Sequence, residues 1–172
     1  ETQTGVTAHY IDEGCDTGDV IEQTAISILD EDTGGEILAK YRDVYFPIVV
    51  SVLEKAKSNS ISANKQNEEL ASFFGERTPE DGGIDWNWNG ERIRNWVRAQ
   101  AYPYPGAFFN LQQNKIIVDK VLIKELYQYN NVKNGTVVQI DPVIEIKCSD
   151  SIVVLEIIRN NTEVILKIGA EI

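Results

Sequence analysis

Residues 4–21 read TGVTAHYIDEGCDTGDVI, and this stretch decides how the first part of the chain folds. Residues 5–11 and residues 20–28 each carry β-branched and aromatic side chains in rough alternation, so both are predicted to be strands. Glycines punctuate the residues between them, which predicts a loop over residues 12–18. Four carboxylates fall within the eight positions from 12 to 19, and neighbouring like charges repel each other. They are Asp12, Glu13, Asp16 and Asp19.

A solvated acidic turn is the simplest explanation of these carboxylates. A calcium loop of the EF-hand type fits poorly, because Gly14 and Thr17 stand where an acid and the glycine belong.

The next segment has the pattern of an amphipathic helix. Thr33 and Glu36 have the spacing of a capping box, and apolar residues then recur every three or four positions over residues 37–53. Pro47 interrupts this pattern, so a kink or a break is expected there. Residues 55–69 are polar and are predicted to form a loop, and the composition shift over residues 55–75 is the best candidate domain boundary.

The second half of the chain predicts a turn, a helix and then several strands. Residues 78–83 (TPEDGG) predict a turn, and residues 90–100 predict a helix with its apolar residues on one face. Short apolar runs separated by turns follow from Phe108 onward and suggest a small closed or sandwiched β domain. The runs are residues 115–123, 136–140, 143–148, 152–158 and 163–168.

Composition limits the possible partners. The net charge of −11 and the sequence pI of about 4.5 make the surface acidic, and such a surface repels nucleic acids and anionic lipids unless a basic patch forms locally. No apolar run is long enough to span a bilayer, so no membrane association is expected. The two cysteines lie far apart and outside any C-x-x-C pair, which predicts reduced thiols, no metal site and a cytoplasmic protein.

The beginning of the chain is unusual. The sequence contains no methionine, starts on Glu1 and enters a strand-like run within a few residues. We therefore expect a fragment of a longer protein.

Two motifs and the strand-rich tail carry a resemblance to a known family. Residues 4–21 resemble the loop segment of the 10-formyltetrahydrofolate-dependent formyltransferases, and residues 77–108 (RTPEDGGIDWNWNGERIRNWVRAQAYPYPGAF) are similar to their interdomain segment. The family includes methionyl-tRNA formyltransferase and the sugar-nucleotide N-formyltransferases. The resemblance implies an α/β fold, with residues 1–75 as the C-terminal part of a Rossmann-like catalytic domain. Residues 76–172 would then form a linker helix and a small OB-like β domain.

The resemblance also implies a partial catalytic site. The family uses an Asn, a His and an Asp, and only the Asp has a counterpart here, which is Asp16 in Asp-Thr-Gly. His9 lies in the strand before the loop and does not match the catalytic histidine. The cosubstrate 10-formyltetrahydrofolate would be held largely by backbone groups of Asp12, Glu13, Gly14, Cys15 and Asp16, because its pterin edge carries donors and acceptors. The Cys15 thiol is expected to pack rather than react, and no metal is implied.

Two kinds of amine are candidates for the acceptor of the formyl group, the amine of a charged initiator tRNA and that of a nucleotide-linked amino sugar. From Gly106 onward the chain has seven basic and eight acidic residues, so the tail lacks the excess of Lys and Arg that tRNA recognition needs. Residues 74–86 (FGERTPEDGGIDW) look closer to the sugar-modifying members. In that hypothesis, Arg77 binds a diphosphate and Trp86 stacks on the base. The simpler alternatives are a solvated arginine and a tryptophan packed in the core.

We therefore predict formyl transfer to the amine of a nucleotide-linked amino sugar, catalysed by a parent protein that is a homodimer and needs no nucleic acid. Methionyl-tRNA is the alternative acceptor. A non-catalytic fragment that serves in binding or dimerisation is the second alternative.

Overall fold

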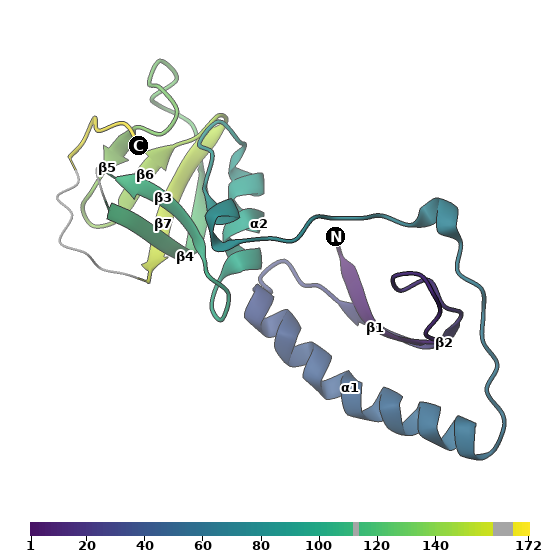
Figure 1. Cartoon of the computed structure of the whole chain (residues 1–172). Coiled ribbons are helices and arrows are strands. Elements are labelled where there is room, and N and C mark those ends of the chain that lie inside the picture. The colour runs from purple at the N-terminus through teal and green to yellow at the C-terminus, as the bar shows by residue number, and fades with distance from the viewer. Residues whose placement is uncertain (112–113, 160–166) are drawn as a thin grey trace. The chain divides into compact units, whose positions relative to one another are not determined.

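The computed structural model describes residues 1–111, 114–159 and 167–172 (Figure 1). The chain divides into two compact units. The first unit consists of residues 1–32 and 36–76, and the second unit of residues 33–35 and 77–172. Each is described by itself.

The first unit is built on a β-hairpin. Strand β1 (Gln3–His9) pairs antiparallel with β2 (Val20–Ser27), and the register runs from Gln3 opposite Ser27 to His9 opposite Val20, with an irregularity after Ala8 (Figure 1). The structure confirms both predicted strands and the loop between them. The alternation of the sequence explains the pairing, since side chains at every second position share one face of the hairpin.

One helix covers this hairpin. Helix α1 (Gly34–Lys57) buries Ile48 against Val6 of β1 and Ile26 of β2. A polar contact lies beside this cluster, where the Glu22 carboxylate accepts hydrogen bonds of 2.7 Å from Ser51 Oγ and from Lys55 Nζ. The apolar cluster and the partly buried carboxylate bonds together hold the helix against the strands.

Two expectations for this helix need correction. The helix is not broken at Pro47, and it continues to Lys57 although residues 55–57 are expected from the sequence to be loop. A kink at Pro47 stays a prediction. A proline removes one backbone N–H donor, but the neighbouring turns of a 24-residue helix keep theirs, and Ile48 next to it is held in the core. The bond from Lys55 to Glu22 gives the last turns a tertiary contact that composition does not reveal.

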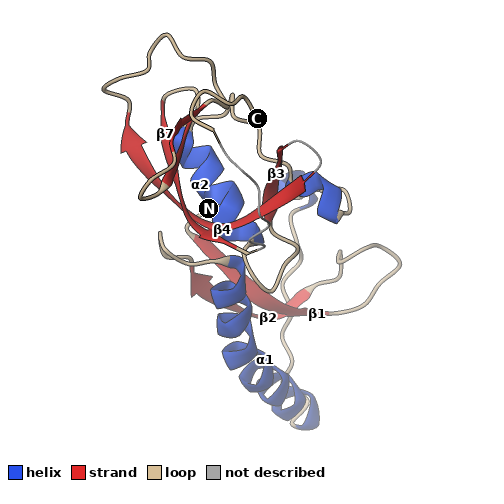
Figure 2. Ribbon diagram, turned by 90° about the vertical axis from the view of Figure 1, so that its left-hand side faces the viewer, coloured by secondary structure: helices blue, strands red, loops and turns tan. Residues whose placement is uncertain are grey.

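The second unit contains, within the described residues, a five-stranded antiparallel sheet and one α-helix. Figure 2 shows the sheet curling around helix α2 (Gly90–Gln100), whose bounds agree with the prediction. The strand order is β3-β4-β7-β6-β5. The bounds are β3 (Ala107–Leu111), β4 (Asn114–Glu125), β5 (Val137–Gln139), β6 (Ile144–Lys147) and β7 (Ser151–Ile158).

The core of the second unit lies between α2 and the sheet. Ile93 and Val97 of α2 are buried together with strand residues such as Val118, Ile146 and Val153. Two short 3-10 helices lie elsewhere, η1 (Glu68–Leu70) in the first unit and η2 (Pro79–Gly82) in the second. None of the helices in the described ranges is long and apolar enough to cross a membrane.

The predicted mixed helix and strand fold is confirmed, whereas the OB-like description of the sheet stays a prediction. The sequence pattern does not indicate strand β3, because this strand follows directly on a Pro- and Gly-rich stretch that is typical of a helix stop. The predicted strand over residues 163–168 lies mostly outside the described residues.

Candidate functional site

The acidic loop between β1 and β2 is closed by its own hydrogen bonds. The Tyr10 N–H donates to the Asp19 carbonyl at 3.0 Å. Asp12 Oδ1 accepts from Thr17 Oγ1 at 2.6 Å and from the Gly14 N–H at 3.0 Å. The Thr17 hydroxyl in particular lowers the pKa of the Asp12 carboxyl below its ordinary value. Asp12 therefore organises the inside of the loop through Oδ1, and a role for it in cosubstrate binding stays a prediction.

Gly18 allows the two ends of the loop to approach. A Cβ at this position would overlap the carbonyl oxygen of Tyr10, so the close approach of the two backbone segments requires glycine.

Asp16 differs from the other acids of the loop. Its backbone is in the left-handed region, with a φ of 59°, which Asp tolerates better than most residues. Its side chain is 86% exposed, and Oδ1 lies 3.6 Å from His9 Nε2. His9 Nδ1 contacts the Tyr10 carbonyl oxygen at 2.8 Å and must donate to it, because a carbonyl only accepts. The Asp16 carboxylate thus faces solvent and attracts His9 whenever that ring is protonated.

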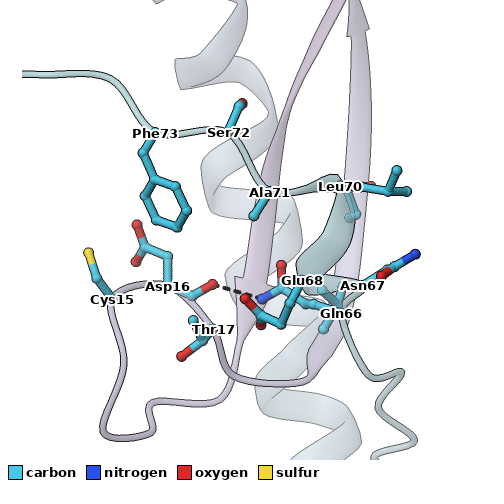
Figure 3. Close-up of a pocket in the computed structure, with 12 residues that line it drawn as sticks. Cys15, Asp16, Thr17, Gln66, Asn67, Glu68, Leu70, Ala71, Ser72 and Phe73 are labelled. Atoms are coloured by element: carbon cyan, nitrogen blue, oxygen red, sulfur yellow. Dashed lines mark hydrogen bonds between the residues drawn. The ribbon is translucent and has the colours of Figure 1, made fainter.

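A cavity of about 520 Å³ opens beside this loop within the first unit (Figure 3). Its walls come from the loop, from β2 and from residues 66–73. The volume falls in the range of small-molecule sites. The lining residues are Cys15, Asp16, Thr17, Val20, Gln23, Gln66, Asn67, Glu68, Leu70, Ala71, Ser72 and Phe73.

Gln66 joins the two sides of this cavity. Its Nε2 donates to the carbonyl of Asp16 at 2.8 Å and to the carbonyl of Gly18 at 2.7 Å, and Figure 3 shows the side chain reaching the loop. Just before it, Asn64 and Val20 exchange two backbone hydrogen bonds of 2.8 Å. Sequence reasoning missed Gln66, since the polar run around it has no periodicity and was expected to be an ordinary loop.

The five residues predicted to hold the pterin are not equivalent. Cys15 and Asp16 line the cavity, whereas Asp12, Glu13 and Gly14 lie in the same loop outside the cavity wall. In the described part of the chain, no residue forms a hydrogen bond to the backbone N–H of Cys15 or Asp16, and both residues are exposed. These backbone N–H groups can donate hydrogen bonds to acceptor atoms on the edge of a heterocycle. Leu70 and Phe73 line the same cavity and provide apolar surface for such a ring.

Arg77 and Trp86 both lie in the second unit but make different contacts. The Arg77 guanidinium stacks over the ring of Trp96, 4.4 Å from its centroid, and is hydrogen-bonded to the Asp81 carbonyl at 3.3 Å. Trp86 is buried in the core and packs edge-on against Phe109, with ring centroids 5.6 Å apart. Trp86 therefore occupies a packed position, and a role for either residue in substrate binding stays a prediction.

Trp86 also borders a second cavity of about 440 Å³, which Phe108, Asn110 and Lys133 help to line. Its indole Nε1 is buried and has no hydrogen-bond partner among the described residues. The two cysteines are free, Cys15 exposed and Cys148 buried. Within residues 1–111, 114–159 and 167–172, no group of three or more His, Cys, Asp or Glu side chains is placed to hold a metal ion.

Comparison with solved structures gives similar folds at low sequence identity. The chain matches HypX from Aquifex aeolicus in complex with tetrahydrofolic acid at 19% identity and a TM-score of 0.67, covering 95% of this chain and 28% of that one. It also matches an N-formyltransferase from Helicobacter canadensis, in complex with folinic acid and dTDP-3-aminofucose, at 20% identity and a TM-score of 0.64. This match covers 91% of the present chain and 56% of the Helicobacter protein. Methionyl-tRNA formyltransferase from Clostridium thermocellum matches at 20% identity and a TM-score of 0.59, covering 87% of this chain and 57% of that one.

The chain thus spans between 28% and 57% of the length of these three proteins. Two family models match it directly. The model described as formyl transferase covers residues 1–53, which include the acidic loop, and the model described as formyl transferase, C-terminal domain, covers residues 77–169. The chain belongs to the formyl transferase family.

Proposed function

We propose that the protein to which this chain belongs transfers a formyl group from 10-formyltetrahydrofolate to the amine of a nucleotide-linked amino sugar. One observation carries the proposal. The family-matched loop presents the exposed Asp16 carboxylate, in a left-handed backbone conformation, at the wall of a 520 Å³ cavity. An exposed acid held in this way is available to a reacting group, unlike Asp12, whose carboxylate is bonded within the loop.

The chemistry assigns Asp16 a supporting role in proton transfer. An amine that attacks a formyl carbon forms a tetrahedral oxyanion, and the amine must lose a proton. In our proposal, Asp16 orients the family's catalytic His and stabilises its positive charge. It also takes part in proton transfer through water. The Asn and His implied by the resemblance have no counterpart in residues 1–172, so Asp16 would act together with groups outside this chain.

The loop would hold the cosubstrate through its backbone. The free N–H groups of Cys15 and Asp16 fit an acceptor on the pterin edge, and the neighbouring carbonyls fit its donors. The similarity to proteins solved with folinic acid and tetrahydrofolic acid supports a folate ligand. In this assignment, the first unit is the C-terminal part of the catalytic domain. The second unit is the C-terminal domain, as predicted for residues 76–172.

A nucleotide sugar is favoured over tRNA as the acceptor by the charge of the chain. With a net charge of −11 and slightly more acids than bases from Gly106 onward, a polyanionic tRNA would be repelled from most of the surface. The Helicobacter canadensis protein, which is similar in fold, was solved with a nucleotide amino sugar. We also propose that the protein works as a homodimer in the cytoplasm.

The test uses the complete native protein. It is incubated with 10-formyltetrahydrofolate and, separately, with UDP-, dTDP- and GDP-linked amino sugars and with methionyl-tRNA. The products are identified by mass spectrometry. Formylation of at least one amino sugar is expected, whereas formylation of the tRNA alone would refute the proposed acceptor. Light scattering of the same sample tests the dimer.

A further inference from the structure

We infer that Gln66 is a positioning residue, which fixes the backbone of residues 16–18 so that Asp16 faces the cavity. The inference rests on the proposed function, because it assigns Gln66 to the site at which Asp16 would act. Gln66 stands 50 positions away from Asp16 in the sequence, on the segment that forms one wall of the cavity.

A single amide group holds two carbonyls of the loop. A primary amide has two N–H donors, and Nε2 of Gln66 uses them on the carbonyls of Asp16 (2.8 Å) and Gly18 (2.7 Å). The Asp16–Thr17 and Gly18–Asp19 peptide units are thereby oriented toward Gln66. Because Asp16 has a φ of 59°, holding its carbonyl toward Gln66 fixes the direction in which its Cα–Cβ bond leaves the backbone. Figure 3 shows the Asp16 carboxylate directed away from Gln66, on the side of Phe73.

The backbone on both sides of Gln66 makes its own hydrogen bonds. On one side, Asn64 and Val20 form a two-bond bridge that fastens the segment to the start of β2. On the other side, the Asn67 side chain accepts from the Glu69 N–H at 3.1 Å and caps η1. The amide therefore reaches the loop from a backbone that is fixed on the hairpin itself, which makes its two bonds a constraint on the loop.

The contact needs a donor and tolerates a positive charge. Both partners are carbonyl oxygens, and the loop carries four carboxylates, so an acceptor in place of Nε2 would be repelled. An ammonium group can donate to both carbonyls, whereas a thioether of similar size cannot donate at all. These differences separate the donor function of Gln66 from its packing.

The experiment compares Gln66→Met, which keeps the size of the side chain, with Gln66→Lys, which keeps the donors. Gln3→Met is the matched control, because Gln3 is exposed on β1 of the same hairpin. Steady-state kinetics of the complete native protein give kcat and KM for each substrate. For Gln66→Met we expect kcat/KM for 10-formyltetrahydrofolate to fall roughly tenfold or more, as for the loss of two hydrogen bonds, and KM for the amine to stay within about twofold.

Gln66→Lys should retain activity within about threefold, and Gln3→Met should match the wild type. Equal losses in Gln66→Met and Gln66→Lys, or no loss in either, would overturn the inference.

A second measurement is independent of activity. Hydrogen exchange of the loop amides over residues 13–18 should become roughly tenfold faster in Gln66→Met, while exchange in α1 stays unchanged. Unchanged loop exchange would overturn the positioning role. If the wild type formylates no acceptor, the proposed function fails, and the exchange result alone decides whether Gln66 holds the loop.

Discussion

At the scale of single residues, three of the four acidic residues of the loop make different contacts. Asp12 is bonded inside the loop, the Asp19 carbonyl closes it, and Asp16 presents its carboxylate to solvent beside the cavity. We expect Asp16→Asn to lower kcat for formyl transfer by about 100-fold or more, since a proton-transfer group is lost. Asp19→Asn is the control, with kcat within about twofold of the wild type. Full activity of Asp16→Asn in initial-rate assays would contradict the assignment.

The Asp12 carboxyl provides a pH test of the loop. Its pKa is lowered from the ordinary value of 3.8, first by the hydrogen bond from Thr17. Because the pKa is lower in the folded loop, the contribution of this bond is present above the unfolded pKa and is lost as the pH falls through the folded pKa. Thr17→Val should therefore raise the Asp12 pKa toward 3.8, as followed by NMR titration of its carboxyl carbon. An unchanged midpoint would show that Thr17 is not the cause.

At the scale of elements, α1 is held to the hairpin by few apolar contacts. Ile48 is 3% exposed and packs on Val6 and Ile26, whereas Leu53 on the same helix is 62% exposed. We expect Ile48→Ala to reduce the free energy of unfolding of the first unit by about 2–3 kcal/mol, because it leaves a cavity. Leu53→Ala should change it by less than about 0.5 kcal/mol. Urea denaturation followed by hydrogen exchange in β1 and β2 measures both, and equal effects would contradict this packing.

Helix α2 offers a capping test in the second unit. Its N-terminal amides are satisfied by the Asn89 side chain, which accepts from the Arg92 N–H at 2.8 Å, and by Asp150, which accepts from the Gly90 N–H at 2.9 Å. Asn89→Ala should cost about 1 kcal/mol of the second unit's stability in chemical denaturation. The exposed loop residue Asn130 is the control, and its replacement by alanine should have no measurable effect.

The spacing of apolar residues predicts a strand or helix correctly where burial of one face decides its structure. The alternation in β1 and β2 and the apolar face of α2 were sufficient, because the buried faces follow the periods of strand and helix. The helix end at Lys57 was not predictable in this way, since Lys55 is kept helical by Glu22, 33 positions away. The same holds for the candidate site. The resemblance identified Asp16, but the bond from Gln66 depends on tertiary structure and leaves no periodic signal.

At the scale of the whole molecule, the two units have separate cores. All residues of the larger apolar cluster come from positions 84–172, and those of the smaller one from positions 6–48. We therefore expect residues 77–172, expressed alone, to fold and to unfold cooperatively, as an independent domain does. Far-UV circular dichroism during urea denaturation tests this, and a gradual, non-cooperative loss of signal would contradict it.

The positions of the tryptophans determine which unit tryptophan fluorescence can report on. The chain has three tryptophans, Trp86, Trp88 and Trp96, and all of them lie in the second unit. Emission excited at the red edge of the protein absorption band therefore reports on that unit alone, and the loop that carries Asp16 is silent. Ligand binding at the loop could leave the emission spectrum unchanged even at saturation. A tryptophan introduced at Phe73, which lines the cavity, would give the first unit a fluorophore of its own.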